Sequence, residues 1–406
     1  MFDIKSLFSK KKDQLDVSPA VTAKLKENGA APKKESKLGV TLQAFSRFNL
    51  KDLFAGKKQF VGLDIGSSSL KLVEVLGNKG SYNMNRFITV PLGKGIIVDG
   101  AVVDIDALAE ELSRLFKNSG CQKKSIVTSL SGHSVIIKKA TFPTMDAHDL
   151  QETIHDEASK YLPFDNMDDV NFDFQVLGRS ASNPNQNEVI IVAAKKEIIE
   201  GYAESLELLK LSLAIMDVDS FALETMYQEN YEYEEKDVVV IANIGASITS
   251  LNVLRNAASI FTRDFTLGGN MITEAIQSQY GVSFEEAEKI KLHGPEGDEY
   301  AKGEFFRNTL LSLADPLCAE IERSIDYFRS TYSDEDIKMI LLAGGGASIP
   351  GIVNDLSQRL SVPVEIINPF KKISYNRKTM DDDHIKEIAP IVAVAVGLAL
   401  RKLGDK

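Results

Sequence analysis

The chain has 406 residues, of which 44% are hydrophobic and 26% are charged, as is ordinary for a soluble globular protein with more than one domain. The formal net charge of −11 is unevenly spread, because residues 1–58 hold thirteen Lys and Arg against six Asp and Glu, a net charge of +7, which leaves −18 for the remainder. The acidic body argues against binding to nucleic acid, whereas the basic segment could contact an anionic membrane surface.

The basic extension, residues 1–58, contains an internal repeat. The motif Phe-x-Ile/Leu-Lys-x-Leu-Phe occurs at 2–8 and again at 48–54, and lysines follow each copy. The sequence between the copies is rich in Ala, Lys, Glu and Pro, so most of the extension is expected to be disordered. A short helix would gather the apolar residues of one copy on one side, as in a membrane-surface or partner-docking helix; a solvated tail is the alternative.

Residues 61–75 predict a strand, a glycine turn and a second strand. An apolar run ends at Asp64, and the turn contains Gly66 and three serines. Small residues in a tight turn let backbone N–H groups converge on an anion, and an acid at the strand end could hold hydrated Mg²⁺ beside phosphates. Taken alone, the pattern equally fits a plain hairpin turn.

The rest of the first half predicts a subdomain interrupted by an insertion. The first subdomain comprises residues 59–133 and 197–232, with an amphipathic helix, buried strands and a further helix over 197–211. Residues 134–196, here called the inserted subdomain, predict a β–α–β–β unit.

Residues 233–406 form a second half that repeats the opening pattern. Asn243 takes the place of Asp64 at the end of an apolar strand, and Gly245 takes the place of Gly66. Two such units predict a duplicated fold with its cleft between the copies. Further along, the pattern predicts a smaller subdomain at about 270–335, a buried strand that runs into three glycines, and a buried helix over 390–403.

Cysteine usage and hydropathy indicate the cellular compartment of the protein. Cys121 and Cys318 lie far apart and form no Cys-x-x-Cys pair, so both are expected to be buried, reduced thiols, as in a cytosolic protein. The first residues lack the apolar core of a signal peptide, and the longest apolar run, 391–400, is too short to span a bilayer.

Three glycine turns at strand ends, with a helix-starting glycine pair between the second and the third, resemble the nucleotide-binding motifs of the actin-like ATPase superfamily. The first phosphate loop, the second phosphate loop and the adenosine motif would be Asp64-x-Gly66-x-x-x-x-Lys71, Asn243-x-Gly245-x-x-x-Thr249 and Leu342-Ala343-Gly344-Gly345-Gly346-Ala347. Narrower matches lie at 61–75, 142–176, 218–223 and 281–291. On these stretches residues 58–406 resemble, more narrowly, the PilM family of type IV pilus assembly proteins, which are relatives of FtsA. The resemblance implies an α/β, actin-like duplicated fold of two halves around a nucleotide cleft, with an FtsA/PilM-type inserted subdomain.

The resemblance also implies ATP and Mg²⁺ as cofactors. Asp64 would hold Mg²⁺ through water, and Lys71 would meet the phosphates as a point charge. Glu288 and Lys291 would bracket the ribose or base, a surface ion pair being the alternative. The implied nucleotide-binding residues are Asp64, Gly66, Ser67, Ser68, Ser69, Lys71, Asn243, Gly245, Ala246, Ser247, Gly268, Gly269, Glu288, Lys291, Gly344, Gly345 and Gly346. No residue is assigned as catalytic.

Asn243 departs from the superfamily, many of whose ATPases carry Asp at this point. An amide cannot accept a proton, and no acid close by in the sequence obviously replaces it. We therefore expect ATP binding with slow or absent hydrolysis, so that ATP acts as a clamp on the two halves.

In the PilM family a groove beside the inserted subdomain receives the short cytoplasmic tail of the inner-membrane protein PilN. The resemblance thus implies a cytoplasmic scaffold, peripheral at the inner membrane, of the type IV pilus or the related type II secretion platform. PilO, pilus ATPase components and a second copy of the chain are further candidate partners, and the extension could touch the membrane. The alternatives are an active ATPase or kinase of the superfamily and an FtsA-like membrane-tethered filament protein.

Overall fold

The computed structural model describes residues 2–3, 60–180, 183–297, 299–332, 335–377 and 380–402. Among these residues, none of the helices is long and apolar enough to cross a membrane. The expectations for residues 4–58, which include disorder and the second repeat, lie outside the described residues.

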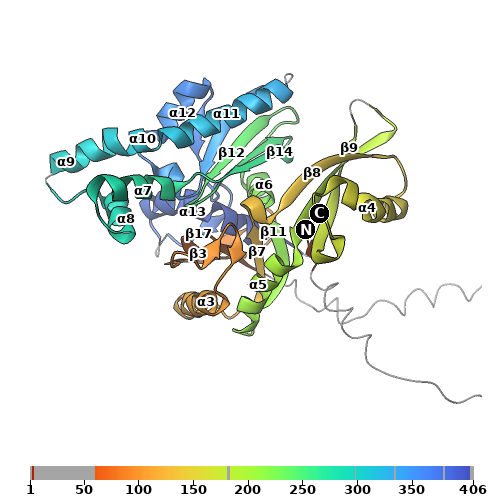
Figure 1. Ribbon diagram of the computed structural model, residues 1–406, viewed down its shortest axis with the longest axis horizontal. Helices are drawn as coiled ribbons and strands as arrows, with labels where there is room; N and C mark the ends of the chain where they lie inside the picture. Colours follow the sequence, from red (N-terminus) through yellow and green to blue (C-terminus); the bar gives the residue numbers. More distant parts are fainter. Residues whose placement is uncertain are drawn as a thin grey trace, which may run out of the picture. The chain divides into compact units, whose positions relative to one another are not determined.

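The first half is built on a seven-stranded sheet (Figure 1). Its strands, in spatial order, are β1 (Phe2–Asp3), β11 (Ser212–Val218), β7 (Ser125–Leu130), β2 (Val61–Ile65), β3 (Ser69–Leu76), β4 (Asn83–Pro91) and β17 (Ser374–Tyr375). Strands β2, β3 and β4 are antiparallel neighbours, whereas β7 runs parallel to β2 and β11 runs parallel to β7. Strand β2 therefore carries an antiparallel hairpin on one side and parallel strands on the other.

The second half repeats this arrangement in a five-stranded sheet. Its strands, in spatial order, are β14 (Ala258–Phe265), β13 (Thr249–Arg255), β12 (Val238–Ile244), β15 (Ile337–Ala343) and β16 (Val364–Ile366). The order and the strand directions match those of β4, β3, β2, β7 and β11, with antiparallel pairs on one side of β12 and parallel pairs on the other. The predicted duplicated fold is confirmed.

Two helices, α6 (Asp219–Asn230) and α13 (Asp382–Leu400), lie between the two sheets, and their apolar residues form one core with both. Strand β12 is buried on both faces, as its unbroken apolar run requires. Its residues Val239 and Ile241 face that shared core, while Val238 and Val240 face α11 (Asp315–Thr331) and α12 (Ile352–Leu360). Figure 1 shows α11 and α12 on the outer side of this sheet.

Helix α13 is longer than the expected 390–403 and contains Pro390 in its interior. It begins after Asp381, whose side chain accepts a hydrogen bond from the backbone N–H of His384. Proline removes one helical hydrogen bond, but burial of the apolar turns that follow compensates for this loss. Gly397 lets α6 approach, because a Cβ atom there would lie 1.9 Å from the carbonyl oxygen of Ala222.

The remaining elements form the outer parts of the two halves. The first half carries α3 (Ile105–Ser119), α5 (Lys196–Glu207) and a small ribbon of β5 (Ile97–Val98) and β6 (Ala101–Val102). The second half carries α7 (Gly269–Tyr280), α8 (Phe284–His293), α9 (Glu299–Glu304), a π-helical turn (Phe305–Thr309) and α10 (Leu310–Leu313).

A separate three-stranded sheet with its own core lies within the predicted 134–196. It consists of β8 (Ile136–Pro143), β10 (Gln186–Lys195) and β9 (Val170–Arg179), and is covered by α4 (Ala147–Tyr161). In Figure 1 this unit and the α7–α8 region stand at opposite ends of the view.

One local expectation was wrong. The helix expected over 197–211 ends at Glu207, because the chain then turns through Lys210 in a left-handed conformation and starts strand β11. Phe2 and Asp3 form a short strand on the edge of β11, and the rest of the first repeat lies outside the described residues.

Candidate functional site

A cavity of about 510 Å³ lies where two glycine turns and the turn after β15 meet, a size that suits a small-molecule ligand. Sixteen of the seventeen residues predicted to bind nucleotide line it. The exception is Gly268, which lies behind the second turn, where a Cβ atom would come within 2.5 Å of the carbonyl oxygen of Gly245. The sequence motifs therefore converge in space, although their role in binding stays a prediction.

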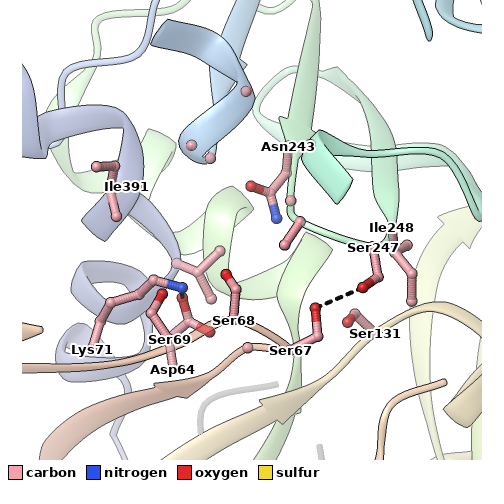
Figure 2. A pocket seen from close by; sticks show the side chains of 18 of the residues that line it. Asp64, Ser67, Ser68, Ser69, Lys71, Ser131, Asn243, Ser247, Ile248 and Ile391 are labelled. Atoms are coloured by element: carbon pink, nitrogen blue, oxygen red, sulfur yellow. Dashed lines mark hydrogen bonds and ion pairs between the residues drawn. The ribbon is translucent and has the colours of Figure 1, made fainter. Parts of the chain in front are cut away.

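The first hairpin, β2 and β3 with the turn between them, supplies a charged pair. Asp64 and Lys71 are cross-strand partners, and Lys71 Nζ lies 3.1 Å from Asp64 Oδ2. The turn is closed by the N–H of Gly66, which donates to the carbonyl of Ser69 over 3.1 Å. Figure 2 shows both charged side chains beside the three serines of this turn.

The second hairpin, β12 and β13 with the turn between them, has the same backbone and a neutral pair. Asn243 and Ser250 are cross-strand partners, and the N–H of Gly245 donates to the carbonyl of Ile248 over 2.9 Å. The two turns touch, since Ser67 Oγ and Ser247 Oγ lie 2.9 Å apart, as the dashed line in Figure 2 marks. The hydroxyl pair joins the two halves across the cavity.

Glu288 and Lys291 also line the cavity. Lys291 Nζ lies 2.6 Å from Glu288 Oε2 and donates to Thr273 Oγ1 over 2.8 Å and to the carbonyl of Gly269 over 3.2 Å. The lysine thereby ties α8 to the first turn of α7. Its ammonium group is held at the cavity wall, where a ligand anion or polar ring atom would be attracted.

The glycine turn after β15 packs against the second hairpin. Gly344 has a φ of 80°, and a Cβ atom there would lie 2.3 Å from the carbonyl oxygen of Ile244, so only glycine fits. Its N–H donates to the carbonyl of Pro390 on α13 over 2.8 Å. The interior proline of α13 thus lies one hydrogen bond away from the cavity.

Asp219 is an acid of the cavity wall that sequence reasoning missed. It begins α6 directly after β11 and accepts a hydrogen bond from Ser129 Oγ over 2.5 Å. Its side chain is partly buried and lines the cavity. Burial, followed by the negative charge of Asp64, raises the pKa of Asp219 well above its ordinary value of 3.8. The signal was the apolar run over 212–218 that ends in an acid, as at Asp64, but no strand was expected there.

This donor set fits a hydrated divalent cation beside phosphates. Carboxylate and hydroxyl oxygens are hard ligands of the kind Mg²⁺ takes, usually one or two carboxylates completed by water and phosphate oxygens. The described residues contain no group of three or more His, Cys, Asp and Glu that could hold a metal ion alone. Asp64 and Asp219, with the serines of the first turn, match the sparser requirement.

Comparisons with known proteins agree with this architecture. A family model described as "Type IV pilus assembly protein PilM" matches residues 62–403. A chain of a solved structure titled "PilM-PilN type IV pilus biogenesis complex" is 31% identical with a TM-score of 0.75, and the match covers 84% of this chain and 98% of that chain.

Cell division proteins FtsA are more distant relatives. FtsA of Bacillus subtilis (strain 168) is 22% identical over 76% of this chain and 78% of its own length. FtsA of Enterococcus faecalis (strain ATCC 700802 / V583) is 24% identical over 74% and 76%, respectively. The predicted actin-like fold with two related halves is confirmed, and this chain belongs to the PilM family of type IV pilus assembly proteins.

Proposed function

We propose that this protein is an ATP-binding cytoplasmic scaffold of the type IV pilus assembly platform, peripheral at the inner membrane, which docks the cytoplasmic tail of a PilN-like protein. The observation that carries the proposal is the cavity shared by the two hairpins, lined by Asp64 and Lys71 on one side and Asn243 on the other. The partner is suggested by the similar chain, whose structure is titled a PilM-PilN complex.

The phosphates of ATP would lie against the two glycine turns, whose backbone N–H groups and serine hydroxyls are suited to anions. Lys71 would contribute a point charge, and Asp64 would hold Mg²⁺ through water, with Asp219 as a second acid nearby. The bound ion would neutralise phosphate charge and order the phosphate chain. The turn at Gly344 would admit the adenosine, beside Glu288 and Lys291.

ATP would favour one arrangement of the two halves, because both contribute to its site. Among the contacts that join the halves, two lie between the turn regions: the Ser67–Ser247 hydroxyl pair and a hydrogen bond of 2.9 Å from the N–H of Gly132 to Asp264 Oδ2. A ligand that binds the closed arrangement more tightly shifts the population toward it. A partner tail beside the first half could sense that shift.

Hydrolysis is the second candidate function, and Asp219 favours it. Asn243 cannot accept a proton, but a carboxylate with a raised pKa in the cavity could take one from an attacking water. In this case the chain is a slow ATPase. The rate of ATP hydrolysis then separates the enzyme from a scaffold that only binds ATP.

Binding and turnover of MgATP, measured on the full chain together with binding of a PilN-like tail peptide, test the proposal. The scaffold predicts micromolar or tighter ATP binding, turnover far below one per second and tail binding that changes with nucleotide. Turnover near one per second would favour the enzyme. Failure to bind ATP at millimolar concentration would remove the nucleotide clamp, and failure to bind the tail would remove the docking function.

A further inference from the structure

Strand β11 would be the edge of the first sheet if the N-terminus did not pair with it. β1 runs antiparallel to β11, with Phe2 opposite Met216 and Asp3 opposite Ile215. An edge strand presents unpaired N–H and C=O groups, and an extended peptide can add to it as a further strand. The chain's own first residues make such an addition.

The equivalent edge of the second half is different. Its strand β16 has three residues, and no strand of the described part of the chain pairs with its outer side. Strand β11 has seven residues, and the two residues of β1 cover only part of its length. The first half therefore offers a longer edge, and the described residues fill it incompletely.

The strand β1 also lies against β9 of the inserted subdomain. On β9, the side-chain nitrogen of Asn171 is buried and has no hydrogen-bond partner among the described residues. A buried amide without a partner is uncommon and costs free energy. An extended occupant beside β9 that brought a carbonyl oxygen to this amide would remove that cost.

We propose that the outer edge of β11, with β9 beside it, is a docking site for an extended segment, and that the chain's own N-terminal strand occupies it as an internal competitor. A strand tethered to its site acts at a high effective concentration, so an incoming strand must displace it. This proposal rests on the proposed function only in taking the natural competitor to be a PilN-like tail.

The duplicated motif of the extension provides a matched control. Phe2→Gly with Asp3→Pro in the full chain removes an aromatic side chain and a backbone donor from β1, and Phe48→Gly with Asn49→Pro makes the corresponding change in the second copy. The probe is a fluorescein-labelled peptide of residues 1–8, with a scrambled peptide as its control. Fluorescence anisotropy gives the affinity, and hydrogen exchange reports protection of the β11 amides.

We expect the probe to bind the Phe2/Asp3 variant at least tenfold more tightly than the wild type, with faster exchange in Ser212–Val218 when no peptide is added. The Phe48/Asn49 variant should behave as the wild type. Equal probe affinity for all three proteins would overturn the proposal. Tighter probe binding and faster β11 exchange in the Phe48/Asn49 variant alone would overturn it as well. Unchanged thermal melting of both variants excludes unfolding as the cause.

A PilN-like tail peptide added afterwards separates this inference from the proposed function. Displacement of the bound probe supports both. If the probe binds the opened edge but the tail does not displace it, the inference that β1 competes for this edge stands. The edge is then excluded as the docking site of the tail.

Discussion

The two hairpins share one backbone and differ in charge. In each, the first glycine of the turn closes it with an N–H bond to the carbonyl three residues later. In each, the residue at the strand tip faces the residue seven positions on: Asp64 faces Lys71 in the first, and Asn243 faces Ser250 in the second. Duplication has kept the geometry, while formal charge at these positions remains only in the first half.

This difference indicates how the two halves would share a ligand. Asp219 also belongs to the first half, so that half holds the acids beside the first turn and the lysine opposite Asp64. The second hairpin adds hydroxyl and amide groups, which can close on phosphates without introducing another charge that must be desolvated. Such a hairpin can close and open at low electrostatic cost.

Removal of the carboxylate of Asp64, the acid of the first hairpin, should have the largest effect on MgATP binding. Asp64→Ala removes the carboxylate that would hold Mg²⁺ and leaves Lys71 without its partner. We expect MgATP affinity to fall by about 100-fold or more, which corresponds to ~3 kcal/mol, measured by calorimetry. The matched control is Asp106→Ala, an exposed aspartate on α3. Equal affinities for both variants would remove Asp64 from the site.

Giving the second hairpin the acid of the first should alter turnover more than affinity. Asn243→Asp places a carboxylate where it can order the attacking water or accept its proton, and we expect phosphate release to rise by about tenfold. Asn243→Ser, which adds no acid, is the control. An unchanged rate would mean that the missing acid does not limit hydrolysis.

A smaller loss is expected at the second half's own cation. Lys291→Met breaks the 2.6 Å pair with Glu288 and removes the charge from the cavity wall. We expect nucleotide affinity to fall by about fivefold, equivalent to ~1 kcal/mol. Lys289→Met on the same helix is the control, since its pair with Glu286 is outside the cavity. Similar nucleotide affinities for the two variants would indicate that Glu288 and Lys291 are only a surface ion pair.

Local patterns were sufficient to predict the repeat of the two hairpins. Strands and turns near Asp64 and Asn243 are encoded by short apolar runs followed by small turn residues, a signal that lies within a few consecutive residues. The one helix of the inserted subdomain, α4, was likewise predicted as part of the β–α–β–β unit, and the structure shows Asp146 capping its first turn.

The parts that could not be predicted depend on distant contacts. Four residues separate strand β11 from the end of helix α5, the left-handed Lys210 is among those four, and the pairing of β11 with β7 is long-range. The buried turns of α13 extend back through Pro390 because both sheets enclose them. Because β11 was not predicted, Asp219, which follows it directly, was not recognised as the second acid of the site.

The smallest expected effect tests how that second acid is coupled to the first hairpin. Because the pKa of Asp219 is raised in the folded protein, the folded state keeps a proton that the unfolded state releases. The contribution of this carboxyl to stability is therefore present at low pH and is lost as pH rises from its ordinary value of 3.8 through the raised pKa. Asp219→Asn cannot ionise and still accepts the bond from Ser129.

We expect the melting temperature of Asp219→Asn, measured without nucleotide or metal, to equal that of the wild type near pH 4 and to exceed it by about 2–4 °C at pH 8. In an Asp64→Ala background the gain should shrink, because the charge of Asp64 contributes to the raised pKa. A lower melting temperature at pH 8 would show that ionised Asp219 stabilises the fold. The negative charge near the first hairpin would then be structural, with no need of a bound cation to offset it.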